Sequence, residues 1–208
     1  MLNYNFFKSQ NDSKQLLVML HGFISDSTTY DSHIEQLSQH VNVLTIDLPG
    51  HGKDTSDMND TWDFPYIAHA LDEVLSQYDM YDVYLLGYSM GGRVALYYAL
   101  NGSVALRGLL LESTSAGIQS EADKVERVQV DAARAKVLEI AGLEIFVNDW
   151  EKLPLFRSQY ELDAEVRKAI RANRMSQNPV RLAKALRDYG TGNMPNIWPQ
   201  VSSLSVRT

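Results

Sequence analysis

A group of glycines around one serine constrains the fold of this chain more than any other feature. Residues 87–92 read Gly-Tyr-Ser-Met-Gly-Gly, after an apolar run at 83–86 and at the start of a helical pattern at 90–100. A strand that turns directly into a helix leaves little space, so glycines two positions before and after Ser89 keep the crossing backbones clear. We therefore predict a sharp strand-to-helix turn that exposes the Ser89 hydroxyl at a helix N-terminus, where negative charge is favoured. The alternative is a plain Gly/Ser turn.

Short apolar runs elsewhere in the chain are typical of strands in a parallel sheet that is buried on both faces. These runs cover residues 16–20, 41–46, 83–86 and 106–111. Helical patterns at 66–77 and 90–100 alternate with them. The alternation predicts an α/β fold with a mostly parallel, doubly wound sheet.

The pattern changes in the second half of the chain. Residues 121–190 have an almost entirely helical period, and we interpret the short apolar run at 144–147 as helix too. This predicts a helical cap inserted after a core strand. We expect residues 1–112 to form the N-terminal part of the core, 113–190 the cap, and 191–208 a return to the core.

Composition narrows the possible functions. The chain has no cysteine, which excludes disulfides, thiolate catalysis and cysteine-based metal sites. The formal net charge of −7 argues against general nucleic-acid binding. No stretch approaches the ~20 apolar residues of a membrane span, and the start lacks the pattern of a secretory signal. We expect a cytoplasmic protein that binds neither nucleic acid nor membrane; its oligomeric state is not predicted.

Positive charge is concentrated in the predicted cap. The first 112 residues carry 5 Lys/Arg and 14 Asp/Glu, whereas residues 113–190 carry 13 Lys/Arg and 12 Asp/Glu. Two interpretations are open for these basic residues. They cover solvated helix faces in i,i+4 pairs, or some of them face an anionic substrate.

A serine at such a turn needs hydrogen-bond donors for the negative charge that develops on a bound carbonyl. The loop after the first central strand and the residue after the serine supply backbone N–H groups of this kind. We predict Phe23 and Met90 as these donors. We expect His21 to be a hydrogen-bonding residue that lines the substrate site, and His51, in a Pro-Gly-His-Gly turn, to be scaffolding.

The residues that would activate the serine are not evident. A serine is a poor nucleophile or base until a histidine takes its proton and a carboxylate orients that histidine, and the usual chain order is Ser, acid, His. All histidines precede Ser89, and residues 189–208 contain no Asp or Glu. Glu112 is a possible acid in variant layouts. The histidines are His21, His33, His40, His51 and His69.

Several motifs together resemble one family. They are Gly-Tyr-Ser-Met-Gly-Gly-Arg at 87–93, Asp-Leu-Pro-Gly-His-Gly at 47–52, His-Gly-Phe at 21–23, Trp-Glu-Lys-Leu-Pro-Leu-Phe at 150–156 and Tyr-Gly-Thr-Gly at 189–192. With them the chain resembles the MenH family, the 2-succinyl-6-hydroxy-2,4-cyclohexadiene-1-carboxylate synthases, and most of all the versions from Gram-positive bacteria. The resemblance runs from about residue 1 to about residue 200. The arginine after the double glycine and the 150–156 stretch are its most particular parts.

The resemblance implies an α/β-hydrolase fold and a lyase of menaquinone biosynthesis. The reaction eliminates pyruvate from 2-succinyl-5-enolpyruvyl-6-hydroxy-3-cyclohexene-1-carboxylate, with no metal or organic cofactor. The triad serine and histidine act in proton abstraction, and the oxyanion hole holds the developing charge. Because this small substrate carries several carboxylates, the resemblance implies carboxylate contacts for Arg93, Arg127 and Arg174, and places Tyr88 and Trp150 among the pocket aromatics. For each arginine the alternative is a helix-surface position.

The chain differs from the family's pattern at its C-terminal end. Family members continue with another strand, a loop that carries the triad Asp and a later Gly-His turn that carries the triad His, whereas this chain ends at Thr208. We therefore expect the last core strands and helices to be missing and the chain to be inactive as a lyase. Two other functions are considered: a carboxylesterase of the same fold, acting for example on pimeloyl esters, and a non-catalytic binding remnant.

Overall fold

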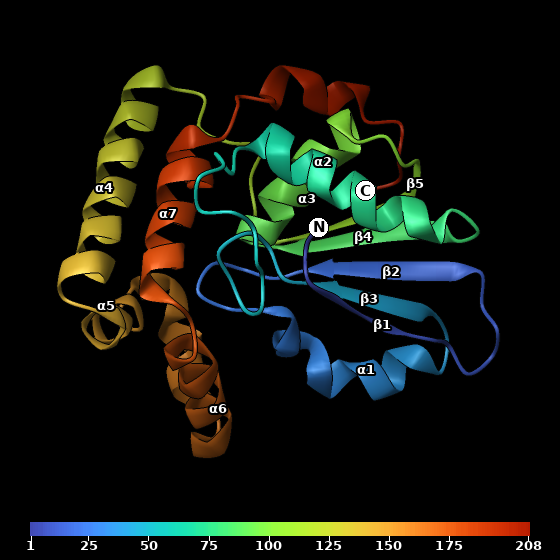
Figure 1. Cartoon of the computed structure of the whole chain (residues 1–208), viewed down its shortest axis with the longest axis horizontal. Coiled ribbons are helices and arrows are strands. Elements are labelled where there is room, and N and C mark those ends of the chain that lie inside the picture. Colours follow the sequence, from blue (N-terminus) through green and yellow to red (C-terminus); the bar gives the residue numbers. More distant parts are fainter.

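A single sheet of five strands forms the core, and helices cover both of its faces (Figure 1). The computed structural model describes all of residues 1–208. Along the sheet the strands are β1 (Tyr4–Phe7), β3 (Asn42–Ile46), β2 (Gln15–Leu20), β4 (Asp82–Tyr88) and β5 (Leu106–Glu112). Strands β3, β2, β4 and β5 are parallel, and β1 pairs antiparallel with β3. The predicted α/β fold with a mostly parallel sheet is confirmed.

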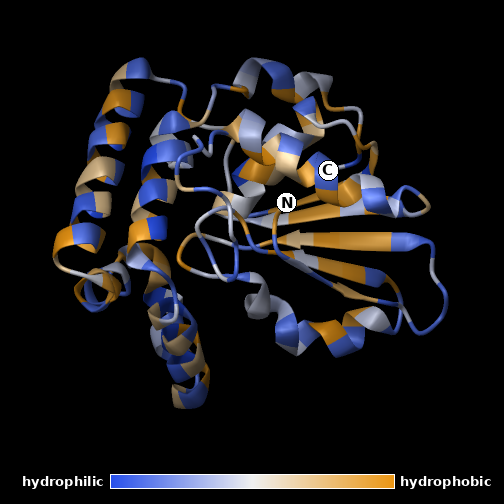
Figure 2. Cartoon of the chain, viewed as in Figure 1, coloured by the Kyte–Doolittle hydropathy of each residue, from blue (hydrophilic) through white to orange (hydrophobic).

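The helices of the core divide between the two faces of the sheet. Helix α1 (Asp31–Ser38) lies on one face, and α2 (Phe64–Leu75) and α3 (Met90–Asn101) lie on the other (Figure 1). Helix α2 begins at Asp63, whose side chain accepts a hydrogen bond from the Tyr66 N–H, and this satisfies one free donor of the first turn. Figure 2 shows the apolar residues gathered in the central strands β2 and β4, as expected for strands covered on both sides.

Two elements were not predicted from the sequence, β1 and α1. Strand β1 lies at the edge of the sheet, and none of its residues is fully buried. Helix α1 likewise has no fully buried residue, so its sequence lacks a wide apolar stripe. Both elements therefore have weak hydrophobic patterns.

The turn at Ser89 has the predicted geometry. Strand β4 ends at Tyr88, α3 begins at Met90, and Ser89 between them has φ 51° and ψ −109°. A Cβ atom on Gly91 would lie only 2.3 Å from the backbone oxygen of Leu20 in β2. The strained serine and the close approach of the backbones confirm the predicted nucleophile elbow.

The cap consists of four helices beside one end of the sheet (Figure 1). They are α4 (Glu121–Ile140), α5 (Leu143–Trp150), α6 (Ala164–Met175) and α7 (Pro179–Tyr189), with a 3₁₀ segment at Pro154–Glu161. The run at 144–147 is helical, as predicted. The cap has an apolar cluster of its own, formed by Ala135, Leu138, Phe146, Val147, Leu182, Ala183 and Leu186 together with Ile24 from the core.

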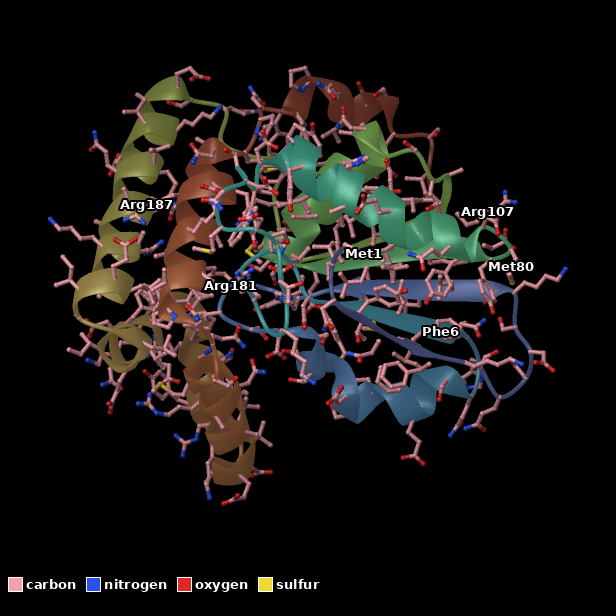
Figure 3. The ribbon with its side chains drawn as sticks, in the orientation of Figure 1. Met1, Phe6, Met80, Arg107, Arg181 and Arg187 are labelled. Carbon is pink, nitrogen blue, oxygen red and sulfur yellow. The ribbon has the colours of Figure 1, made fainter.

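Polar contacts join the cap to the core through α7 and the turn before it. Arg181 Nη2 lies 2.7 Å from Asp54 Oδ2, on the side of α7 that faces the core (Figure 3). Gln177 donates from Nε2 to Asp26 Oδ2 at 2.8 Å. On its other side α7 is joined to α4, since Arg187 pairs with Glu139. Helix α7 therefore contacts both the core, through Arg181, and α4 of the cap, through Arg187.

The chain returns to the core after α7. A 3₁₀ segment covers Trp198–Ser203, and the Leu109 N–H of β5 then donates to the Arg207 oxygen at 2.9 Å. Gly108 and Arg207 form an isolated parallel bridge. Residue 207 thus lies beside β5 in a parallel arrangement. In none of the helices is there an apolar stretch that would reach across a lipid bilayer.

The close approach at the elbow gives a prediction for stability. Gly91→Ala should lower the free energy of unfolding by about 3 kcal/mol or more, because the new methyl group meets backbone atoms that cannot move aside. Gly142→Ala is a control for backbone strain alone, since its methyl meets no atom within 4 Å, while φ 85° and ψ 173° is a conformation almost restricted to glycine that costs about 1–3 kcal/mol for alanine. Urea unfolding measures both. Equal losses in the two variants would contradict the steric argument.

Candidate active site

A cavity of about 1030 Å³ lies between the core and the cap, and its lining contains almost all of the predicted site residues. From the core it receives the β2 loop, the elbow and the loop after β5, and from the cap it receives side chains of every helix. The predicted residues that line it are Phe23, Tyr88, Ser89, Met90, Arg93, Arg127, Trp150 and Arg174. Among the predicted residues, only His21 is absent from the lining.

Ser89 lies on the cavity wall, and the lining also contains Phe23 and Met90, whose backbone N–H groups are the predicted hydrogen-bond donors. The N–H groups of Phe23 and Met90 take part in no hydrogen bond within the protein. Strands β2 and β4 are neighbours in the sheet, with Leu20 paired to Gly87, so the loop that holds Phe23 emerges beside the elbow. This arrangement can stabilise negative charge on an oxygen atom bound next to Ser89.

The loop that carries Phe23 is held in a strained conformation. Ile24 has φ 57°, although a β-branched residue strongly disfavours this region. Its side chain is fully buried in the apolar cluster of the cap. The Phe23 ring contacts cap aromatics as well, 5.4 Å from the Trp150 ring and 6.2 Å from the Phe146 ring. The cap therefore packs against two consecutive side chains of this loop, Phe23 and Ile24.

Arg93 is a partly buried cation without a partner. It lies four residues after Ser89 on α3 and lines the cavity, but its guanidinium makes no ion pair, and its Nε atom is buried without a hydrogen-bond partner. Burial, with repulsion from Arg127, lowers the pKa of Arg93 to about 10. An unpaired cation of this kind is costly, and a bound anion would relieve the cost.

Helix α4 contributes two further arginines to the cavity wall. Arg127 donates from Nε to the buried Asp131 at 2.9 Å, and Arg134 Nη1 lies 3.5 Å from the same carboxylate oxygen. The Arg134 guanidinium also covers the Trp150 ring, 5.3 Å from its centroid. Asp131 is the one carboxylate shared by both guanidiniums. This wall therefore carries excess positive charge.

Arg174 lies in a different environment on α6. Its Nη1 atom pairs with Glu151 Oε1 at 3.1 Å, and its Nη2 atom donates to Gln159 Oε1 at 3.0 Å. The second oxygen of Glu151 is taken by Arg171 at 2.6 Å. The guanidinium of Arg174 also lies over the Phe156 ring at 4.8 Å. Arg174 thus lines the cavity with both ends of its guanidinium hydrogen-bonded within the protein.

Aromatic side chains form much of the remaining wall. Trp150 stacks on Phe146 with ring centroids 5.5 Å apart and planes at 20°, and Phe156 lies 5.6 Å on its other side. Tyr88 packs against the backbone of the β2 loop, since a Cβ on Gly22 would lie 2.9 Å from its ring. These rings give apolar surface for the uncharged part of a ligand.

The expectation that His21 lines the substrate site is wrong. Its side chain is fully buried behind the cavity, Nδ1 lies 2.8 Å from the Gly22 oxygen, and Nε2 accepts from the Leu48 N–H at 3.0 Å. Both ring nitrogens are therefore used by the backbone. His21 is a structural hydrogen-bonding residue that joins the β2 loop to the β3 loop.

None of the other histidines reaches Ser89. His51 is fully buried, with Nδ1 near the Pro49 oxygen and the Tyr189 hydroxyl, which agrees with its predicted scaffolding role. His33, His40 and His69 are exposed on or near α1 and α2, and none lines the cavity. Glu112 is exposed at the end of β5 and is also absent from the lining. No cluster of three or more potential metal-ligating side chains is present.

Known proteins match this chain in sequence and in structure. The alpha/beta hydrolase family matches residues 17–202. A putative 2-succinyl-6-hydroxy-2,4-cyclohexadiene-1-carboxylate synthase from Bacillus subtilis is 32% identical over 196 residues, which are 94% of this chain and 71% of that protein. The synthase from Salmonella agona is 33% identical over 189 residues, with shares of 91% and 73%.

A solved structure agrees. MenH from S. aureus is 57% identical and superposes with a TM-score of 0.97, over 99% of this chain and 77% of that one. The chain belongs to the MenH family of α/β hydrolases. The family resemblance found in the sequence is confirmed.

The sequence did not point to every residue of this MenH-family cavity. Arg134 was missed, although it lies seven residues after Arg127, which places it two turns further along the same helix face. Tyr189 lines the cavity and donates its hydroxyl to the Pro49 oxygen at 2.5 Å. Gln159 was also missed, because its contact with Arg174 depends on the path of an irregular segment.

The buried His51 gives this MenH-family chain a predicted pH dependence of stability. Burial, with the nearby His21, lowers the pKa of His51 from 6.5 to about 3. Below pH 6.5 the unfolded chain binds a proton at this position that the folded chain does not, so stability falls as pH falls. The loss should approach 1.4 kcal/mol per pH unit, or about 2–3 kcal/mol between pH 6.5 and 4.5.

Urea unfolding at several pH values tests this. His51→Asn should make the slope of unfolding free energy against pH shallower in that range. His33→Asn, which changes an exposed histidine on α1, should leave the slope unchanged. Identical slopes for His51→Asn and the unmodified chain would refute the assignment.

Proposed function

We propose that this chain acts in menaquinone biosynthesis as the substrate-binding body of a 2-succinyl-6-hydroxy-2,4-cyclohexadiene-1-carboxylate synthase. The reaction is the loss of pyruvate from 2-succinyl-5-enolpyruvyl-6-hydroxy-3-cyclohexene-1-carboxylate. The proposal is supported by relatives that carry the synthase name. The observation that carries it is Arg93, an unpaired guanidinium on the wall of a cavity whose nucleophile elbow lies one helical turn away.

The charge of the cavity favours a polycarboxylate over a neutral ester. Four arginines line it, Arg93, Arg127, Arg134 and Arg174, and only Asp131 and Glu151 compensate them. Arginine binds a carboxylate through two parallel donors, so the wall suits a substrate with several carboxylates. An esterase that acts on a neutral ester would gain nothing from uncompensated cations beside its nucleophile.

The elimination can be written with all bonds balanced. A base removes the proton from ring carbon 2, next to the succinyl ketone. The ring double bond then shifts from carbons 3 and 4 to carbons 4 and 5, a new double bond forms between carbons 2 and 3, and the bond from carbon 5 to the enolpyruvyl oxygen breaks. The leaving enolate takes up a proton and becomes pyruvate. No redox change occurs, and negative charge builds up transiently on the ketone oxygen.

The residues of the elbow suit the first step. We assign the Phe23 and Met90 N–H groups to the ketone oxygen, where they stabilise the charge that develops as the proton leaves. Ser89 is assigned to the proton transfer at carbon 2, and Arg93 to a substrate carboxylate. Tyr88 and Trp150 are assigned to the walls around the ring.

The serine cannot act alone in this chemistry. Its hydroxyl becomes a base only when a histidine accepts its proton and a carboxylate orients that histidine. Within residues 1–208 every histidine is buried in backbone contacts or exposed away from the cavity. On this proposal, residues 1–208 supply binding, the serine and the oxyanion donors, whereas the Asp and His must be added to them. A binding protein without turnover is the competing function for these 208 residues.

Substitution of Arg93 tests its proposed role in binding a substrate carboxylate. Arg93→Ala should weaken binding of 2-succinyl-6-hydroxy-2,4-cyclohexadiene-1-carboxylate by about 30-fold to 1000-fold, the 2–4 kcal/mol scale of a charged hydrogen bond in a closed site. Titration calorimetry measures the dissociation constant. Arg107→Ala is the control, since Arg107 lies on β5 at the end of the sheet away from the cap (Figure 3). Equal affinity of Arg93→Ala and the unmodified chain would exclude the role.

Turnover of residues 1–208 provides a separate test. We expect pyruvate release several orders of magnitude slower than that of the same chain joined to the remaining C-terminal part of a MenH relative, because only the oxyanion donors and binding contribute. Ser89→Ala in the joined protein should abolish the difference. Activity of residues 1–208 within about tenfold of the joined protein would contradict the proposal and point to an upstream histidine as base.

A further inference from the structure

The two arginines of α4 that line the cavity have a single carboxylate, that of Asp131, as their ion-pair partner. Arg127 and Arg134 lie two turns apart on one helix face, and both line the cavity. Asp131 lies between them and is almost fully buried, with both guanidiniums directed at one of its oxygens. The contact from Arg127 is short at 2.9 Å, whereas the contact from Arg134 is long at 3.5 Å. Asp131 therefore compensates Arg127 well and Arg134 poorly.

Arg134 is held in place chiefly by stacking. Its guanidinium lies 5.3 Å from the centroid of the Trp150 ring, and that ring is fixed between Phe146 and Phe156. Stacking orients the plane of a guanidinium while it leaves the N–H groups along the edge free to donate. Burial and the nearby Arg127 also lower the pKa of Arg134, as expected for a cation that lacks a full partner.

The charges around the cavity are distributed unequally. Arg174 is the one arginine of the α6 side that lines the cavity, and it has two partners, Glu151, which it shares with Arg171 outside the lining, and Gln159. The opposite side holds Arg93, Arg127 and Arg134 with Asp131 as their one buried carboxylate, and so has an excess of two positive charges. Asp131 and Glu151 lie behind the lining, and the one acid that lines the cavity, Asp31, is exposed at the start of α1. An excess of two cations on one wall matches two carboxylates on one ligand.

We propose that Arg134 adds a second guanidinium to the carboxylate contact that the family resemblance implies for Arg127, and that Arg134 thereby selects doubly charged ligands over singly charged ones. This inference rests on the proposed function, because it assigns Arg93 to one carboxylate and the α4 pair to the other. Trp150 and Asp131 are positioning residues for Arg134. A purely structural role, in which Arg134 only covers Trp150, would affect all ligands of this shape equally.

The test compares two ligands that differ in one charge. They are 2-succinyl-6-hydroxy-2,4-cyclohexadiene-1-carboxylate and its methyl ester at the succinyl carboxylate, and titration calorimetry gives both dissociation constants for residues 1–208. The unmodified chain should bind the diacid about 10-fold to 100-fold more tightly than the ester, as expected for one charged hydrogen-bonded pair. Arg134→Met should reduce this ratio to within about threefold, chiefly through weaker binding of the diacid.

Two further variants distinguish the effect of the Arg134 charge on binding from an effect on the structure of the cap. Lys136→Met removes an exposed cation from the same helix and should leave the ratio unchanged. Arg134→Lys keeps the charge without the two-pronged donor and should give an intermediate ratio, which also covers the case that Arg134→Met folds poorly. An unchanged ratio in both Arg134 variants, or equal weakening of the two ligands, would overturn this role of Arg134 while the proposed function stands. If the unmodified chain binds neither ligand, the proposed function fails and the role of Arg134 with it.

Discussion

The close crossing of backbones at the elbow is the constraint on which the rest of the site depends. Gly91 at the start of α3 passes so near to the end of β2 that its N–H donates to the His21 oxygen at 3.1 Å. This contact brings three things to one point: the strained Ser89, the N-terminus of α3 and the loop that carries Phe23. Because β2 and β4 are adjacent parallel strands, Phe23 and Met90 follow strands that end at the same edge of the sheet.

The cap adds charged and aromatic side chains to the cavity beside the elbow. A chain with a formal net charge of −7 concentrates arginines around its one large cavity, and it compensates them to different degrees. Arg174 has Glu151 and Gln159 as partners, whereas Arg93 has none. In a partly desolvated site, a cation without a partner is destabilising to the free protein and correspondingly favourable to an anionic ligand. The arginines of the cavity therefore differ in how fully the protein itself satisfies them.

The sequence predicted the fold and most of the cavity for identifiable reasons. Strands β2 and β3 are buried along most of their length and contain long apolar runs, and the elbow requires glycine at fixed offsets from Ser89, so both leave strong patterns in the sequence. Phe23 and Met90 followed from the order of the elements, and the arginines from the family motifs. Helix α1 and strand β1 escaped detection because neither buries a whole face.

Other features depend on tertiary contacts that no local pattern records. His21 has the residue type of a site residue, but its two ring nitrogens are satisfied by backbone groups from separate loops. The pairing of Arg174 with Glu151 and the stacking of Arg134 on Trp150 depend on how α4, α5 and α6 pack against one another. Sequence spacing could have revealed that Arg134 shares a face with Arg127, but not that one buried carboxylate serves both.

The buried position of Ile24 also bears on the order in which the protein can form. This residue belongs to the first 30 residues of the chain, yet the apolar cluster that surrounds it is built from residues 135–186. During synthesis, domains form from the N-terminus as the chain emerges, at about 5–20 residues per second. The strand β2 can pair with β3 and β4 early, but the cluster around Ile24 is complete only when α4, α5 and α7 have all been made. The loop after β2 is thus among the first segments to be synthesised and among the last to acquire all of its contacts, a long-range closure that slows folding.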